Sequence, residues 1–242
     1  MLLARLPEYL VRYRTRAAIL AMVTLLAIFV AVAIGLRTSL LAHVDLWFTK
    51  EAQERSGVAM RMTMITISSF GNSITLIVVA LATSLFLASR KLKQAAAFAF
   101  ASLIGLPIDF GLKAIFARPR PGQDLVSILL PASGYSFPSG HALGSTVVYG
   151  FLAFLSWVHL KEYKARKPVT VIFAILPLLI SLSRVYVGAH WLSDVVAGVT
   201  LGLIVVILMA LTYQKWAKAA RPVEPTAGPL DPNASDSSSY NA

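Results

Sequence analysis

Six long apolar stretches divide the chain, and their lengths predict transmembrane helices. Three contain no charged residue: 17–36, 71–89 and 195–213. Three more are interrupted by one or two ionisable residues: 94–116, 142–160 and 168–186. A helix needs about 20 apolar residues to cross the roughly 30 Å hydrocarbon core of a bilayer. The predicted fold class is therefore an all-α polytopic membrane helical bundle with six transmembrane helices. The alternative is fewer spans combined with buried re-entrant segments.

The amino-acid composition agrees with a protein that is surrounded by lipid. Hydrophobic residues make up 57% of the 242 residues and charged residues only 14%, whereas a soluble domain carries about 25% charged residues. The mean hydropathy is +0.72. The chain has no cysteine, which excludes disulfides and thiolate metal sites. The net charge of +11 is not arranged as a basic stripe interleaved with aromatic residues, so no nucleic-acid partner is predicted.

The basic residues orient the predicted bundle. Fourteen of the 22 Lys and Arg residues fall in the N-terminal segment, in two of the connections or after the last span. The positive-inside rule places these segments in the cytoplasm. Both termini are then cytoplasmic, which requires an even number of spans and agrees with six. The fourteen residues are Arg5, Arg12, Arg14, Arg16, Arg90, Lys91, Lys93, Lys161, Lys164, Arg166, Lys167, Lys215, Lys218 and Arg221.

The chain is predicted to divide into a membrane domain and a C-terminal tail. Residues 1–221 are predicted to form one membrane domain of the cell (inner) membrane. Residues 222–242, rich in Pro, Ser, Asp and Asn, are predicted to be a disordered cytoplasmic tail. The segment 37–70 is expected to be an outer loop, in which 60–67 is apolar enough to lie along the membrane interface.

Ionisable residues are concentrated at the outer ends of the last four predicted spans. Ionisable groups at depth in a membrane are rare unless they have a function. Four of them are cations on the side where the positive-inside rule expects few, and together they are predicted to hold an anion. The set consists of Lys113, Arg118, Arg120, His141, Arg184, His190 and Asp194, with the acidic residues Asp109 and Asp124 nearby in sequence.

The segment Pro138-Ser139-Gly140-His141 precedes an apolar helix. Serine is a favoured N-cap, and the amide groups of a helix start attract anions. A phosphate would fit at this position. The alternative is a plain helix cap followed by an interfacial histidine.

Two pairs have the spacing of neighbours on one helical face. His190 and Asp194 are four residues apart where the sixth helix is expected to begin. The carboxylate can fix the imidazole tautomer and leave the other nitrogen free to attack, although such a pair can also simply stabilise a helix start. Asp109 and Lys113 are also four apart, so a structural ion pair competes with an anion-binding role for Lys113.

Three segments together resemble the signature of the type 2 phosphatidic acid phosphatase (PAP2) superfamily, which reads K-x6-R-P, P-S-G-H and S-R-x5-H-x3-D. The first segment runs from Lys113 to Arg120-Pro121, the second is Pro138–His141, and the third runs from Ser183-Arg184 through His190 to Asp194. Every signature position is filled in the correct order. The resemblance covers about 105–200, and the six-span arrangement extends it over most of the chain.

The resemblance implies a role for each matched residue. His190 would attack phosphorus to give a phosphohistidine, Asp194 would stabilise its imidazolium, and His141 would protonate the leaving group and then activate water. The remaining matched residues would bind phosphate: Lys113, Arg120, Ser139, Gly140 and Arg184. No metal or other cofactor is needed in this scheme, and the outer face lacks a carboxylate cluster of the kind that holds Mg²⁺.

The implied substrate is a lipid phosphate whose tail stays in the bilayer, with the active site at the outer membrane interface. By resemblance, the candidates are undecaprenyl pyrophosphate, phosphatidylglycerol phosphate and phosphatidic acid. The alternatives are a lipid-pyrophosphate-dependent phosphotransferase and a non-enzymatic lipid-phosphate binder. The soluble haloperoxidases of the same superfamily are disfavoured by the six spans. Membrane lipids are the expected surroundings, and no obligate protein partner is inferred.

Overall fold

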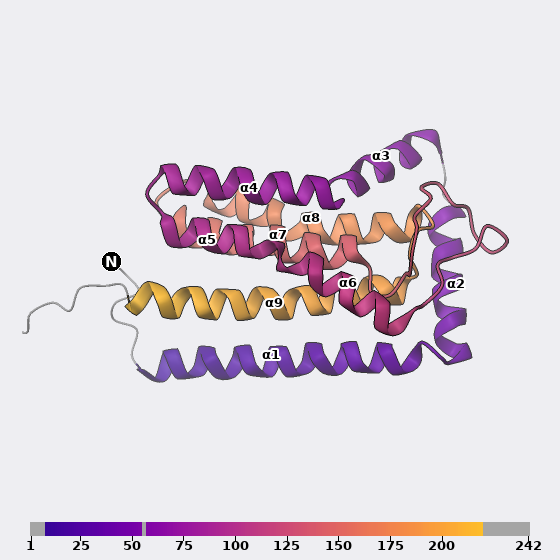
Figure 1. Cartoon of the computed structure of the whole chain (residues 1–242), viewed down its shortest axis with the longest axis horizontal. Coiled ribbons are helices and arrows are strands. Elements are labelled where there is room, and N and C mark those ends of the chain that lie inside the picture. Colours follow the sequence, from indigo (N-terminus) through magenta and orange to yellow (C-terminus); the bar gives the residue numbers. More distant parts are fainter. Residues whose placement is uncertain (1–7, 55–56, 220–242) are drawn as a thin grey trace, which may run out of the picture.

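The computed structural model describes residues 8–54 and 57–219, and this part of the chain is helical without any strand. The tail predicted at 222–242 lies outside the described residues. Most of the helices run along the long axis of the molecule (Figure 1). They are α1 (Glu8–Gly35), α2 (Ser39–Glu54), α3 (Val58–Ser69), α4 (Ser73–Ser89), α5 (Lys93–Ala101), η2 (Ser102–Ile104), α6 (Gly105–Phe116), α7 (Gly140–His159), α8 (Arg166–Tyr186) and α9 (Leu192–Ala219).

The helix lengths support the predicted number of spans. Five helical stretches in the described chain are long and apolar enough to cross a membrane: 15–35 in α1, the continuous run α5–η2–α6, α7, α8, and 192–217 in α9. The pair α3 and α4 passes the same test as one span bent by 53°. The all-α membrane bundle predicted from the apolar stretches is therefore confirmed, with six spans when the bent pair is counted as one.

The segment 37–70 is not the loop that the sequence suggested. It contains α2, which runs across one end of the bundle (Figure 1), and α3, which continues toward α4. The chain bends between α3 and α4 at Phe70–Asn72. The Asn72 side chain accepts a hydrogen bond from the Thr75 amide at 2.8 Å and so caps α4. Because the cap satisfies an amide at the new helix start, the chain can change direction here.

Helix α7 lies at the centre of the bundle, between α8 and α9, and is the most buried of the candidate spans. Gly198 and Gly202 of α9 face its first turns with the spacing G-x-x-x-G, which lets helix backbones approach closely. A Cβ at Gly198 would lie 2.7 Å from the Ser139 carbonyl oxygen, and one at Gly202 would lie 2.6 Å from the Thr146 Cβ. The two glycines therefore fix the start of α7 against the start of α9.

Helix α1 lies on the outside of the bundle against α9. Near its C-terminal end the Phe29 ring contacts the rings of Phe116 and Phe137, with centroids 6.3 and 5.9 Å away. This aromatic cluster fixes the two ends of the connection between α6 and α7. That connection carries several of the polar residues described below.

Candidate functional site

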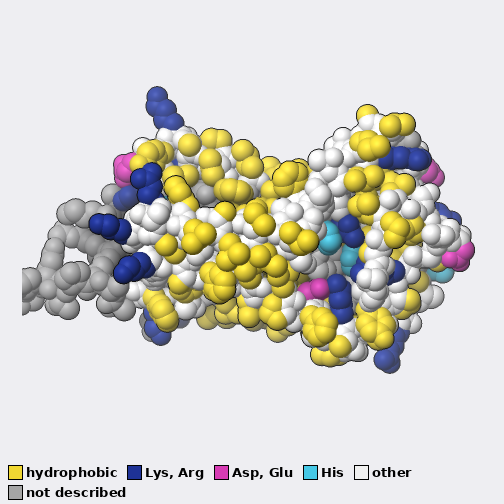
Figure 2. All heavy atoms as spheres, turned by 45° about the horizontal axis from the view of Figure 1, so that its top comes forward, with side chains coloured by type: hydrophobic (Ala, Val, Ile, Leu, Met, Phe, Trp, Pro, Cys, Tyr) yellow, Lys and Arg dark blue, Asp and Glu magenta, His cyan; other side chains and the backbone are white. Residues whose placement is uncertain are grey.

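The ionisable residues predicted from the sequence come together at the end of the bundle that α2 crosses. They arise from α6, the α6–α7 connection, the start of α7, the end of α8, the α8–α9 connection and the start of α9. Figure 2 shows histidine side chains beside basic and acidic ones in a depression between hydrophobic surfaces. Two stretches that are distant in sequence, one around the α6–α7 connection and one around the α8–α9 connection, thus converge on one polar site.

His190 and Asp194 form a buried pair, with exposed fractions of 1% and 0%. His190 Nδ1 lies 3.5 Å from Asp194 Oδ2, which is within ion-pair distance but longer than a hydrogen bond, and Nδ1 has no hydrogen-bond partner among the described residues. The prediction that both residues share a helical face is wrong in detail, because α9 begins only at Leu192. Asp194 lies in the first turn of α9, and its Oδ2 accepts the Trp191 amide at 2.9 Å. The carboxylate thus caps its own helix, as in a capping box, and still faces His190.

The other ring nitrogen of His190 faces a guanidinium group. Arg120 Nη1 lies 3.1 Å from His190 Nε2. A guanidinium only donates hydrogen bonds, so Nε2 must be the acceptor and carry the lone pair. In the neutral ring the proton is then on Nδ1, on the side of Asp194. This is the tautomer that an Nε2 nucleophile requires.

The charge state of His190 follows from its surroundings. Burial lowers the pKa of His190 to about 4, and the positive charges of Arg120 and Arg184 act in the same direction, although Asp194 opposes the shift. The imidazole is therefore neutral at pH 7. Burial also lowers the pKa of Arg120, against the opposing influence of Asp194 and Asp109.

Arg120 is held in place by backbone carbonyl groups. It donates to the carbonyl oxygens of Ser133, Gly134, Tyr135 and Ala189 at 3.0, 3.0, 3.2 and 2.7 Å. Within residues 8–54 and 57–219, no carboxylate forms an ion pair with it, so no described acid neutralises its positive charge by direct contact. The guanidinium group is thus fixed next to Nε2. Because all five of its N–H groups already donate, Arg120 attracts an anion by its charge and exchanges one of these hydrogen bonds to contact it.

The two other predicted phosphate-binding cations have polar neighbours. Lys113 Nζ contacts Asp109 Oδ2 at 2.7 Å. The ion pair that the sequence offered as the alternative to anion binding by Lys113 is therefore present. Arg184 is buried; its Nη1 donates to Ser68 Oγ at 2.6 Å, and its Nε has no hydrogen-bond partner. Arg184 therefore keeps donor capacity that no described protein atom uses.

The first turn of α7 begins as the sequence suggested. Ser139 is the N-cap, and its Oγ accepts from the Ala142 amide at 3.5 Å. Gly140 lies directly against the Asp109 carboxylate, where a Cβ would collide. His141 follows in the same turn, within electrostatic range of Arg184, His190, Lys113 and Arg120. The bend between α3 and α4 comes close to His141, since a Cβ at Gly71 would lie 3.1 Å from its Cδ2.

Arg118 does not join the anion-binding cations, contrary to the prediction that all four basic residues of this face hold an anion. Its Nη1 contacts Asp194 Oδ1 at 2.5 Å and its Nη2 contacts Asp45 Oδ2 at 2.7 Å. Both ends of the guanidinium fork are therefore bound to carboxylates. The sequence reasoning also missed four residues that contact the predicted site: Asp45, Ser68, Ser136 and Ser193. Asp45 alone gave a signal, as an acid within the apolar run from Leu40 to Phe48.

Taken together, the fold and the site define a class of protein: an integral membrane helical bundle with a histidine–aspartate pair and converging cations at one end. Residues 90–218, more than half of the chain, match the family model described as the PAP2 superfamily. The chain belongs to this superfamily. The resemblance drawn from the three motifs is thereby confirmed.

Individual relatives agree with this assignment. The chain is 36% identical over 99 residues to phosphatidylglycerophosphatase B of Bacillus subtilis, a match that covers 40% of this chain and 47% of the relative. It is 32% identical over 142 residues to undecaprenyl-diphosphatase of Sulfolobus acidocaldarius, covering 57% and 64%. These matches therefore span about half to just under two thirds of the relatives' lengths.

Two solved structures share the fold. The crystal structure of a transmembrane PAP2-type phosphatidylglycerolphosphate phosphatase from Bacillus subtilis has a TM-score of 0.70 and 26% identity, covering 84% of this chain and 98% of that one. The Aquifex aeolicus LpxE structure has a TM-score of 0.54 and 21% identity, covering 71% and 95%. The likeness thus extends well beyond the three motifs.

Proposed function

We propose that this protein is a membrane lipid phosphatase that hydrolyses a lipid phosphomonoester or pyrophosphate through a phosphohistidine at His190. The observation that carries the proposal is the arrangement around that ring. Nε2 holds a lone pair beside the Arg120 guanidinium, and Nδ1 faces the buried Asp194 carboxylate. A neutral imidazole oriented in this way is ready for nucleophilic attack on an anion bound by the cation.

The reaction takes place in two steps. In the first, His190 Nε2 forms a bond to phosphorus while the bond to the lipid oxygen breaks, and His141 gives its proton to that oxygen. In the second, water attacks the phosphohistidine, His141 takes a proton from the water, and inorganic phosphate leaves as the P–N bond breaks. Asp194 stabilises the imidazolium that exists between the two steps, as the orienting acid does in a catalytic triad.

The phosphate oxygens are bound by side chains and by the start of α7. Lys113, Arg120 and Arg184 supply positive charge, and Arg can bind two oxygens at once. Ser139 and the Gly140 amide add hydrogen bonds at the helix N-terminus. Fixed cations around the transferring group are the main requirement of phosphoryl transfer. Lys113 shares its charge between Asp109 and the phosphate.

The site's place at the end of a membrane bundle supports a lipid phosphate as the substrate. A lipid phosphate can keep its tail among the helices and present its head group to the site. The names of the relatives indicate phosphatidylglycerol phosphate and undecaprenyl pyrophosphate as first candidates, and phosphatidic acid carries the same phosphomonoester. A phosphotransferase would share the first step and differ only in the acceptor of the second.

The purified protein is expected to release inorganic phosphate from at least one of these three lipid phosphates in detergent with EDTA present. The reason is that side chains neutralise the phosphate in the proposed scheme. The measurement is phosphate release, with and without an added acceptor lipid. Activity that appears only with an acceptor would favour the phosphotransferase. Activity that EDTA removes and Mg²⁺ restores would contradict the metal-independent mechanism.

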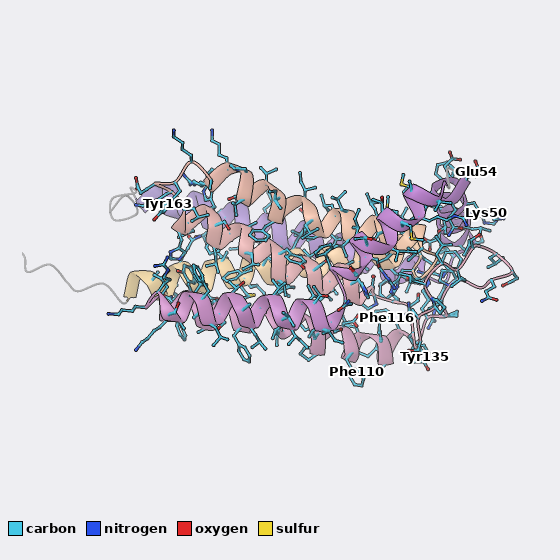
Figure 3. All side chains as sticks on the ribbon, turned by 90° about the horizontal axis from the view of Figure 1, so that it is seen from above. Lys50, Glu54, Phe110, Phe116, Tyr135 and Tyr163 are labelled. Carbon is cyan, nitrogen blue, oxygen red and sulfur yellow. The ribbon has the colours of Figure 1, made fainter. Side chains whose placement is uncertain are left out.

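We further propose that the site faces the periplasm or cell exterior and that both termini are cytoplasmic. Figure 3 shows Tyr135 near the end that carries Lys50 and Glu54, and Tyr163 near the opposite end. Both tyrosines are exposed, by 47% and 65%, and the chain has no native cysteine. In intact cells, an impermeant thiol reagent should label Tyr135→Cys strongly and Tyr163→Cys only after the cells are opened. The reverse pattern would invert the topology.

A further inference from the structure

A carboxylate from α2 is buried beneath the proposed catalytic pair. Asp45 is 1% exposed, although α2 crosses the open end of the bundle. Its Oδ1 accepts the Ser193 amide at 2.8 Å, and its Oδ2 accepts the Ser193 hydroxyl at 2.6 Å. Ser193 lies in the first turn of α9, beside Asp194. Asp45 thus caps α9 from a helix about 150 residues away in sequence.

Arg118 joins this carboxylate to Asp194. Its Nη2 donates to Asp45 Oδ2, and its Nη1 donates to Asp194 Oδ1 and to Ser193 Oγ. The guanidinium group has the planar, forked geometry needed to hold two carboxylates at once. Ser136 fixes the remaining oxygen, Asp194 Oδ2, through a hydrogen bond of 2.6 Å. The Asp194 carboxylate therefore has both oxygens bound and a single orientation relative to His190.

The charges of this cluster also matter. Asp45 and Asp194 are two carboxylates around one guanidinium group, so the buried group carries a net negative charge. A lone Arg118–Asp194 ion pair would be neutral and would stabilise an imidazolium on His190 much less. A buried charge has strong effects because little water screens it. With Asp45 present, the cluster of Asp45, Arg118 and Asp194 keeps a net negative charge, although Arg118 alone would neutralise Asp194.

We propose that Asp45 and Arg118 are positioning residues for the reaction: together they orient Asp194 toward His190 and keep the cluster negative when His190 becomes charged. The proposal rests on the proposed phosphatase function. Neither residue contacts the predicted phosphate-binding groups in the described structure. Their effect should therefore fall on the chemical steps and not on substrate binding.

The test compares Asp45→Asn with Glu51→Gln, which removes an exposed carboxylate from the same helix. Groups that orient a catalytic or metal-binding residue are worth on the order of 10–100-fold. Asp45→Asn should lower kcat by about that factor and leave KM and the inhibition constant of inorganic phosphate within roughly 2-fold of wild type. Glu51→Gln should match wild type in all three.

A second variant covers the case in which Asp45→Asn does not fold. Arg118→Lys keeps the charge, but an ammonium group lacks the fork that binds two carboxylates. It should show the same selective loss of kcat. The proposal is overturned if both variants keep wild-type kcat, or if the binding of inorganic phosphate weakens in proportion to the loss of activity.

A second readout separates this proposal from the proposed function. In ¹⁵N-histidine-labelled protein, the His190 ring signals, assigned with His190→Gln, report the Nδ1–H tautomer. Asp45→Asn should shift these signals, and Glu51→Gln should not. If the wild-type protein hydrolyses no lipid phosphate but the shift is seen, the proposed function fails and the positioning role stands. If activity is present and no shift is seen, the positioning role fails.

Discussion

His190→Ala is expected to lose turnover on every lipid phosphate by about 10⁴-fold or more, the scale seen when a covalent nucleophile is removed. The reason is that no other described group is aligned with the anion site as Nε2 of His190 is, next to Arg120 and backed by Asp194. Lys113, Arg120 and Arg184 remain in this variant. Vanadate should therefore still bind, which can be measured by calorimetry on the purified variant.

His43→Ala is the matched control, because His43 is an exposed histidine on α2. This variant should keep wild-type turnover. If His190→Ala retained more than about a tenth of the activity, His190 would not be the nucleophile. If His190→Ala lost both turnover and vanadate binding, the alanine would have disturbed the anion site. The smaller change His190→Gln should then lose turnover and keep vanadate binding.

His141→Ala is expected to lose activity in a way that depends on the leaving group. His141 is proposed to protonate the departing oxygen, and general acid catalysis is worth roughly 10²–10⁴-fold. A lipid alkoxide is a poor leaving group and needs this proton. An aryl phosphate leaves as a phenoxide and needs it less. The phosphorylation step should thus fall by about 10²-fold or more on a lipid monophosphate and much less on an aryl phosphate.

Pre-steady-state bursts are the right measurement, because His141 is also proposed to activate water in the second step. The burst rate isolates phosphorylation from that later step. His190→Ala provides the comparison, since it should abolish the burst on every substrate. Equal losses on both substrates in His141→Ala would refute the division between nucleophile and acid, while leaving the lipid phosphatase proposal intact.

The spans could be predicted because each is encoded locally. An apolar stretch of about 20 residues has few stable options other than a membrane-crossing helix. The structure bears out the stretch 195–213 within α9 and the stretch 17–36 in α1, which ends one residue earlier, at Gly35. The segment 37–70 was harder, because α2 is short and carries several charges. Its two buried positions, Asp45 and Thr49, are polar, so hydrophobic periodicity gives no sign of a packed face.

The sequence predicts which residues form the site but not which hydrogen bonds and ion pairs join them. The three motifs name residues that the fold gathers at one end, whatever the exact helix bounds. Arg118 shows the limit of this reasoning: its charge and position matched those of an anion ligand, but its partner Asp45 lies 73 residues away. The position of His190 before the start of α9 was likewise not visible, because the i,i+4 spacing does not reveal where a helix begins.

Transfer of phosphate to His190 Nε2 can be tested by trapping the phosphorylated intermediate. Wild-type protein would be mixed with ³²P-labelled substrate, quenched within milliseconds in base, which preserves a phosphoramidate bond, and digested for mass spectrometry. We expect a base-stable, acid-labile phosphate on the peptide that contains His190, present in the wild type and absent in His190→Ala. Phosphate on another residue, or rapid wild-type turnover with no phosphorylated peptide, would contradict it.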